Sequence, residues 1–454
     1  MDLEQRRVTV MGLGRHGGGV AAARYAALAG AIVTVTDTAS ESVLAESLAA
    51  LSELPIARYC LGKHEACDFR SAEVLIVNPA VPPGNSFVEL ARTNGATITT
   101  ELELFLRACP AHIVAVTGSN GKSTTTTMFA EILQASGRKI WLGGNIGRSL
   151  LPDLPHMTSD DWVALEVSSF QLAQLVGEMS IDPPLRCLDA AIVTNCQANH
   201  LDWHGDFAMY AAAKQRILGM IRPGGSVLLN PFATELESWT CPPDVNRVAL
   251  TDDDHIPVLS VPGEHNRINA RCAATAALAV GCELADIQTA LKNFRGLPHR
   301  IELVGEVAGR YFYNDSMATT PESVVVALES LTQPVWLLAG GKDKGGNLSE
   351  LAATIAKHAR GVCFYGAARQ RLYAAIEPYI TASNAIQTAS LSRDAVSIVE
   401  TLDEAVAWCY AHSTAGDALL LSPACSSYDQ FQDYEHRALH FIALMKNIAQ
   451  REAS

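Results

Sequence analysis

The residues best suited to phosphate chemistry lie at positions 117–124, which read Thr-Gly-Ser-Asn-Gly-Lys-Ser-Thr. An apolar run at 113–116 predicts a buried strand before this loop, and a helix is expected after it. Glycines let backbone N–H groups approach phosphate oxygens, the helix N-terminus adds partial positive charge, and Lys122 adds a full charge. The Ser123 hydroxyl is a suitable ligand for Mg²⁺. The usual pattern has a further glycine at position 116, where this chain has Val116, so the loop is a shortened form.

Two further polar side chains follow predicted strands and could complete a nucleotide site. Glu166 ends the apolar run that starts at Trp162, and His200 follows the apolar run at 189–195. Ligands of open parallel sheets lie beyond the carboxyl ends of the strands, so both side chains should face the crevice of the phosphate loop. Glu166 and Ser123 would then form an oxygen-rich Mg²⁺ site, and His200 would contact metal or substrate.

Cationic and hydroxyl side chains farther along the chain are less specific candidates for ligand binding. Lys214 lies in an Ala-rich helical segment, where sequence physics alone favours a solvated surface lysine. Arg300 follows Gly-Leu-Pro-His at a domain junction, where its guanidinium could bind phosphate or form a hinge salt bridge. Lys344 in a glycine-rich loop could bind an acidic substrate or could solvate a turn, and Ser427 offers a donor for a carboxylate.

A second glycine-rich pattern lies near the N-terminus. A strand predicted at 7–11 leads into Gly-Leu-Gly-Arg-His-Gly at 12–17, and a second strand at 31–36 is followed by Asp37. This arrangement fits the dinucleotide fingerprint, in which an acid follows Gly-x-Gly-x-x-Gly by about 20 residues. The pattern could bind a nucleotide sugar or NAD(P), or it could be a structural strand–helix turn.

The elements that must position these residues alternate between strand and helix along the chain, which predicts an α/β fold with doubly wound parallel sheets. A length of 454 residues allows roughly three domains. We expect a Rossmann-like domain at 1–109, a central phosphate-loop ATPase domain with a mostly parallel sheet at 110–299, and a Rossmann-like domain at 300–454. A β-hairpin is expected at 301–313.

Composition narrows the class of partner. The formal net charge of −14 argues against a nucleic-acid or anionic-membrane partner, because few cations would be present to neutralise phosphates over a broad face. The 11 cysteines are scattered singly, so neither a disulfide framework nor a zinc site is expected. We recognise no signal peptide and no apolar run of membrane-spanning length. We therefore expect a cytoplasmic monomer without membrane insertion.

Eight motifs, in order along essentially the whole chain, resemble the Mur ligase family. They lie at 117–124, 144–147, 166–172, 199–202, 265–269, 296–300, 314–316 and 421–427. The shortened phosphate loop is itself the form found in this family. Within the family, the chain most resembles the ligases that add D-glutamate to UDP-N-acetylmuramoyl-L-alanine in peptidoglycan precursor synthesis.

The resemblance implies a reaction. The substrate carboxylate would attack the γ-phosphate of ATP to form an acyl phosphate, and the amine of the incoming amino acid would displace phosphate from it. Two Mg²⁺ ions would stabilise the charge on these oxygens. The N-terminal domain would hold the UDP part of the substrate, so the glycine pattern would be a uridine-nucleotide site and not an NAD(P) site.

The resemblance also implies roles for individual residues. The catalytic residues would be Lys122, Glu166, His200 and Lys214. The Mg²⁺ ligands would be Ser123, Glu166, His200 and Lys214. Lys214 would act as a carbamate, whose anionic oxygens can bind Mg²⁺. This role replaces the interpretation of Lys214 as a surface lysine. The residues implied for ATP are Gly118, Ser119, Asn120, Gly121, Lys122, Ser123, Thr124, Asn269 and Arg300. Those implied for the UDP substrate are Gly14, Arg15, His16, Asp37, Thr38, Asn145, Ser168 and Gln171. Those implied for the amino acid are Thr319, Lys344, Ser427 and Tyr434.

One position departs from the family pattern. The usual run is Asn-Asp-Ser-Lys-Ala-Thr-Asn, whose lysine binds the carboxylate of the incoming glutamate, and here Met317 replaces that lysine. Methionine cannot form this charged contact, although Lys342 and Lys344 could compensate. D-Glutamate remains the expected substrate. The alternatives are L-glutamate, a folylpolyglutamate-synthase-like ligase and, from another class, an NAD(P)-dependent oxidoreductase.

Overall fold

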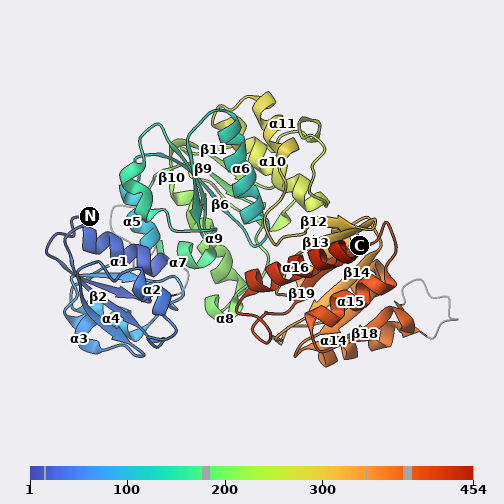
Figure 1. The fold of residues 1–454 in the computed structure, drawn as a ribbon. Helices are drawn as coiled ribbons and strands as arrows, with labels where there is room; N and C mark the ends of the chain where they lie inside the picture. The colour runs from blue at the N-terminus through green and yellow to red at the C-terminus, as the bar shows by residue number, and fades with distance from the viewer. Residues whose placement is uncertain (15–16, 176–184, 344, 382–390, 453–454) are drawn as a thin grey trace. The chain divides into compact units, whose positions relative to one another are not determined.

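The computed structural model describes residues 1–14, 17–175, 185–343, 345–381 and 391–452. Figure 1 shows the helices and strands in chain order, coloured from blue at the N-terminus to red at the C-terminus. Within the described residues there are three large sheets and one two-stranded sheet. The α/β class expected from the alternating pattern is confirmed. Three residues expected to bind substrates, Arg15, His16 and Lys344, lie outside the described residues.

The first sheet has five parallel strands in the order β3-β2-β1-β4-β5. These strands are β1 (Arg7–Met11), β2 (Ile32–Asp37), β3 (Ile56–Leu61), β4 (Val74–Val77) and β5 (Thr97–Thr99). Its helices are α1 (Gly18–Leu28), α2 (Ala45–Ala49), α3 (Ala66–Arg70), α4 (Ser86–Thr93) and α5 (Glu101–Ala108). The chain runs from β1 outward through β2 and β3, and then returns to β4 on the other side of β1. The boundary between β1 and β4 is therefore a topological switch point, where doubly wound sheets bind ligands.

The second sheet has six parallel strands in the order β11-β10-β9-β6-β8-β7. They are β6 (His112–Thr117), β7 (Ile140–Gly144), β8 (Trp162–Glu166), β9 (Leu188–Val193), β10 (Ile221–Leu229) and β11 (Asn246–Arg247). The α-helices that follow or connect these strands are α6 (Lys122–Ala135), α7 (Ser169–Leu175), α8 (Leu201–His204), α9 (Phe207–Gly219), α10 (Glu264–Ala279) and α11 (Leu284–Asn293). Short 3₁₀ turns lie at Leu151–His156, Thr234–Leu236 and Asp253–His255. All six residues of β9 are buried, as expected for a central parallel strand.

The third sheet is mixed, with the order β12-β13-β19-β14-β15-β18. Its strands are β12 (Glu302–Val307), β13 (Arg310–Asn314), β14 (Val335–Gly340), β15 (Ala359–Tyr365), β18 (Val396–Ile398) and β19 (Ala418–Ala424), and β16 (Ile380–Thr381) pairs separately with β17 (Leu391–Ser392). The helices are α12 (Pro321–Ser330), α13 (Ser349–His358), α14 (Arg369–Ile376), α15 (Leu402–His412) and α16 (Tyr434–Glu452), with 3₁₀ turns at Glu377–Tyr379 and Arg393–Ala395. Strands β12 and β13 are antiparallel, which confirms the expected hairpin, and the other pairs are parallel.

Internal contacts divide the chain into two compact units. The first comprises residues 1–258 and 268–292, with the first two sheets, and the second comprises residues 259–267 and 293–454, with the third sheet. In the first unit a continuous apolar core joins α1 and α5 to side chains of the second sheet's region, among them Leu150 and Leu172. In the second unit apolar clusters cover both faces of the sheet. No helix in the described parts of the chain is long and apolar enough to cross a membrane.

Candidate functional site

The phosphate loop joins β6 to α6 and has two close backbone approaches. Gly118 has φ of 157°, and a Cβ atom there would lie closer than 3.0 Å to Thr194 Oγ1. Gly121 has φ of 79°, and a Cβ atom there would similarly crowd Asn269 Oδ1. Both positions therefore need glycine, on steric grounds as well as for φ. Asn269, which was expected to contact ATP, lies directly against the loop.

Asn195 fixes the shape of the same loop from the end of β9. Its Oδ1 accepts hydrogen bonds from the backbone N–H groups of Ser119 at 3.0 Å and Asn120 at 2.9 Å. The Thr194 hydroxyl donates to the carbonyl of Asn120 at 2.6 Å. Because β6 and β9 are adjacent in the sheet, these contacts form at one set of strand ends, as the sequence predicted. Ser123 and Thr124 lie in the first turn of α6.

Glu166 ends β8, beside the strand that carries the loop. Its side chain is buried, its Oε1 accepts a hydrogen bond from Asn145 Nδ2 at 2.7 Å, and its Oε2 has no hydrogen-bond partner among the described residues. A buried carboxylate oxygen without a partner is costly unless a cation or a ligand approaches it. The donor set at this position therefore fits a divalent metal ion.

Lys214 is buried, with 1% of its surface exposed, so the surface-lysine interpretation is wrong. Lys214 lies on helix α9, and its Nζ donates a hydrogen bond to the carbonyl of Gly118 at 2.7 Å. The same Nζ lies 4.8 Å from the centre of the Tyr210 ring. Burial, and then the charge of Lys122, lower the pKa of Lys214 to about 7. An isolated lysine in an Ala-rich helical segment was expected to be solvated, but here its side chain extends to the phosphate loop.

Lys122 is the first residue of α6, and His200 immediately precedes α8. Lys122 Nζ donates to the carbonyl of Ser119 at 2.9 Å. His200 is exposed and has φ of 54°, a left-handed conformation that is uncommon for residues other than glycine and is found often at functional sites. Its ring centre lies 4.8 Å from that of Phe170, at the start of α7.

The residues expected to bind the UDP substrate form two groups. In the first sheet, Asp37 Oδ2 accepts a hydrogen bond from the Gly14 N–H at 2.9 Å and Oδ1 accepts one from the Ala39 N–H at 2.8 Å, so the carboxylate at the end of β2 fixes the glycine loop. Thr38 is exposed beside it. In the second sheet, Gln171 Oε1 accepts hydrogen bonds from the Ser168 N–H at 2.9 Å and Ser168 Oγ at 3.0 Å, at the start of α7.

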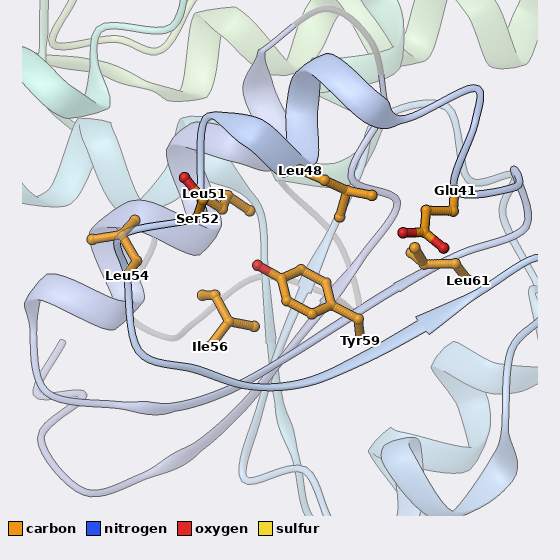
Figure 2. A pocket seen from close by; sticks show the side chains of 8 residues that line it. All are labelled: Glu41, Leu48, Leu51, Ser52, Leu54, Ile56, Tyr59 and Leu61. Atoms are coloured by element: carbon orange, nitrogen blue, oxygen red, sulfur yellow. The ribbon is translucent and has the colours of Figure 1, made fainter.

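A cavity of about 580 Å³ lies elsewhere in the first sheet, between α2 and the edge strand β3 (Figure 2). Its lining consists of Glu41, Leu48, Leu51, Ser52, Leu54, Ile56, Tyr59 and Leu61. None of these residues was expected to bind substrate. The predicted nucleotide residues are therefore at the strand ends and not in this cavity.

One group of possible metal ligands is found away from the phosphate loop among the described residues, at Cys60, Glu65 and Asp68. Arg58 contacts Asp68 at 2.9 Å and also pairs with Glu65, and Lys63 contacts Glu65 at 2.8 Å. These cations already neutralise the two carboxylates, so the group is explained as a salt-bridge network.

In the second unit, the buried Arg437 holds two loops together. Its guanidinium donates to Ser316 Oγ at 2.9 Å, to the Ser316 carbonyl at 2.8 Å and to the Cys425 carbonyl at 3.2 Å. These bonds bring the loop with Thr319 close to the loop with Ser427. The Tyr434 carbonyl accepts a hydrogen bond from Ser316 Oγ at 2.8 Å. Three of the four residues expected to bind the amino acid therefore come from adjoining segments, and the fourth, Lys344, is not described.

Arg300 is exposed next to this region, and Met317 is 37% exposed. The Met317 N–H donates to the carbonyl of His299 at 3.2 Å, which joins the segment before Arg300 to the loop after β13. Asp315 is buried between them, and burial raises its pKa to about 7. Ser422 Oγ donates to its Oδ2 at 2.6 Å.

Comparison with known proteins agrees with this architecture. Residues 116–255 match the Mur ligase middle domain, and residues 299–425 match the Mur ligase glutamate ligase domain. The UDP-N-acetylmuramoylalanine–D-glutamate ligase of Roseiflexus sp. is 35% identical over 485 aligned positions, which cover 98% of this chain and all of the relative. The chain belongs to the Mur ligase family. The equivalent ligase of Geobacter metallireducens is 34% identical, with complete coverage of both chains.

Solved structures of more distant Mur ligases share the fold. The MurC ligase of Thermotoga maritima aligns with a TM-score of 0.60 at 20% identity, covering 98% of this chain and all of the other. MurF of Thermotoga maritima in complex with ADP aligns with a TM-score of 0.58 at 14% identity, covering 99% of each chain.

Some structurally important residues of this Mur ligase were not found from its sequence. Asn195 lies two residues after β9, at a strand end that the sequence placed beside the phosphate loop, but no role was predicted for it. Arg437 had no such signal, since an arginine within a polar C-terminal helix is ordinarily solvated. Its burial depends on contacts with residues more than 100 positions away, such as Ser316.

Proposed function

We propose that this Mur ligase joins D-glutamate to UDP-N-acetylmuramoyl-L-alanine with consumption of ATP, in peptidoglycan precursor synthesis. The observation that carries the proposal is its identity of 33–35% over nearly the whole chain to relatives from Roseiflexus, Geobacter and Koribacter that are D-glutamate ligases. The cluster of the phosphate loop, Glu166 and Lys214 gives that similarity a chemical basis.

The reaction has two displacements. An oxygen of the substrate's terminal carboxylate attacks the γ-phosphorus of ATP, the bond to ADP breaks, and an acyl phosphate forms. The amine nitrogen of glutamate then attacks the acyl carbon, phosphate leaves, and the amine loses a proton. Lys122 and the N-terminus of α6, which begins at this loop, would bind the ATP phosphates and stabilise the charge that develops on them, with Asn269 beside the loop.

Mur ligases use Mg²⁺, which when bound stabilises negative charge on phosphate oxygens as a Lewis acid. We assign its ligands to Ser123, Glu166, His200 and a carbamylated Lys214, at two sites. The Oε2 atom of Glu166, which no described residue contacts through a hydrogen bond, supports this assignment. The lowered pKa of Lys214 supports the carbamate, because CO₂ reacts with the neutral amine, forming an N–C bond and releasing one proton.

The substrate sites are assigned on the same basis. The UDP part would lie at the glycine loop with Gly14, Arg15, His16, Asp37 and Thr38, and the sugar–peptide part near Asn145, Ser168 and Gln171. Arg300 would contact ATP. The amino acid would be bound by Thr319, Lys344, Ser427 and Tyr434. The domain boundaries 1–109, 110–299 and 300–454 remain predictions, as do a monomeric state and the cytoplasm as the place of action, where ATP is available.

The test measures release of ADP and phosphate from Mg-ATP in the presence of UDP-N-acetylmuramoyl-L-alanine. D-Glutamate, L-glutamate and no amino acid are compared. We expect release that depends on D-glutamate. Release that depends on L-glutamate would keep the mechanism and change the amino acid, and no release with either would refute the proposed acceptor.

A further inference from the structure

Gln174 makes an unusual set of contacts between the two sheets of the first unit. Its side chain is 4% exposed and lies near the end of α7. Its Nε2 lies within hydrogen-bond distance of three backbone carbonyls, those of Asn78 at 3.3 Å, Pro79 at 3.4 Å and Val81 at 3.1 Å. Carbonyl oxygens only accept hydrogen bonds, so the side-chain NH₂ group of Gln174, and not its side-chain oxygen, faces this loop.

The loop at 78–81 lies where the first sheet changes direction. Asn78 follows β4, and Gly12 follows β1, on the two sides of the topological switch point. Asn78 Nδ2 donates to the Gly12 carbonyl at 3.1 Å, and its Oδ1 accepts from the Ala80 N–H at 3.0 Å. A Cβ atom on Gly12 would lie 2.7 Å from Asn78 Cβ, so the two loops are closely packed.

Helix α7 is itself fixed to the centre of the second sheet. It begins three residues after Glu166, and the N–H group of Val167 bonds to the carbonyl of Val116 at 2.9 Å. The Thr117 hydroxyl donates to the Val167 carbonyl at 2.8 Å. A continuous set of contacts therefore leads from the strand of the phosphate loop, through α7 and Gln174, to the glycine loop of the first sheet.

We propose that Gln174 is a positioning residue for the nucleotide-sugar substrate, because its amide holds loop 78–81 and, through Asn78, the loop that begins at Gly12. This inference rests on the proposed function, which places the UDP part of the substrate at the glycine loop. Gln174 need not touch the substrate. It sets the arrangement of two loops at the point where a ligand of this sheet binds.

The test compares Gln174→Leu, which keeps a side chain of similar size and removes the donors, with Gln288→Leu. Gln288 Nε2 donates to a single carbonyl, that of His255 at 3.2 Å, in the same unit but away from these loops. We expect Gln174→Leu to raise the KM and Kd for UDP-N-acetylmuramoyl-L-alanine by about threefold to tenfold, the effect of losing one or two hydrogen bonds. The KM for ATP and kcat should stay within about twofold of wild type.

Amide hydrogen exchange gives a readout that does not need the substrate. In Gln174→Leu the N–H groups of Ala80 and Val81, which bond to Asn78, should exchange faster, and in Gln288→Leu they should not. Unchanged exchange, or an equal loss of affinity for ATP and nucleotide sugar, would overturn the inference. If the wild-type protein fails to bind UDP-N-acetylmuramoyl-L-alanine, the proposed function is refuted, and so is the effect of Gln174 on binding of that substrate. Amide hydrogen exchange would still decide whether Gln174 holds loop 78–81.

Discussion

At the scale of single residues, the chemistry depends on burial of charged groups next to one loop. Glu166 and Lys214 are both buried: one Glu166 oxygen has no hydrogen-bond partner in the described part of the chain, and the pKa of Lys214 is lowered. Each is unfavourable in isolation, because charges taken from water must be compensated. Both become favourable if Mg²⁺ and a carbamate join them, since the carbamate replaces a cation with an anion beside the metal.

Lys214→Ala should abolish ligation, with partial recovery when short-chain carboxylates are added to replace the carbamate oxygens. The pKa of Lys214 is about 7, so its neutral fraction grows as the pH rises through 7. Reactivation of CO₂-depleted wild-type enzyme, compared at equal concentrations of dissolved CO₂, should therefore be faster at pH 8 than at pH 6. Phosphate release measures both effects. Full activity of the Lys214→Ala variant would show that ligation does not need a carbamate at this position.

Met317→Lys should lower the KM for D-glutamate, because an ammonium group would be available to pair with a substrate carboxylate. Met317 is 37% exposed, so the longer polar side chain can be accommodated without burying its charge. The KM for ATP serves as the internal control. An unchanged KM for glutamate would mean that other cations already provide the contact.

At the scale of elements, the strand–loop–helix unit is the most predictable part of the molecule. The glycine spacing and the apolar run before it identified β6, the loop and α6 correctly, because these features depend on neighbours in sequence. The burial of Lys214 and the contact of Gly121 with Asn269 depend on α9 and α10 packing against that unit. Such contacts between distant segments follow from tertiary packing, which local periodicity does not encode.

Gly121→Ala should reduce ATP affinity as well as stability. Its φ of 79° costs an alanine roughly 1–2 kcal/mol, and the new methyl group would displace Asn269 from the loop. Gly137→Ala is the matched control, since Gly137 has φ of 78° but no atom within 4 Å of the added Cβ. Urea unfolding should show destabilisation in both variants, and a larger one in Gly121→Ala because its methyl group also displaces Asn269. ATP titration should show weaker binding in Gly121→Ala alone. Equal losses of ATP affinity would contradict this account.

At the scale of the whole molecule, each compact unit contains a carboxyl group with a raised pKa. Burial raises the pKa of Glu101 in the first unit, and of Asp315 in the second, to about 7. The Glu101 carboxylate accepts a hydrogen bond from Ser149, which offsets part of this effect. Between the ordinary pKa of a carboxyl group and pH 7, the folded state holds a proton that the unfolded state has lost. Stability should therefore fall as the pH rises across this window.

Glu101→Gln should remove the contribution of Glu101 to this pH dependence. The raised pKa corresponds to a cost on the order of 3 kcal/mol above pH 7, so the variant should be more stable than wild type at pH 8 and similar at pH 4. Thermal unfolding at both pH values measures the difference. A stabilisation of equal size at pH 4 would show that packing, and not ionisation, is responsible.

The close approach of Gly118 to Thr194 has a consequence for inhibitor design. A side chain at Gly118 or Gly121 would collide with neighbouring residues, and α6 begins at this loop with main-chain N–H groups whose chemistry no substitution alters. A compound whose affinity came from those N–H groups would leave few viable escape mutations at the loop itself. Resistance would have to arise at more distant positions, or through greater abundance of the enzyme.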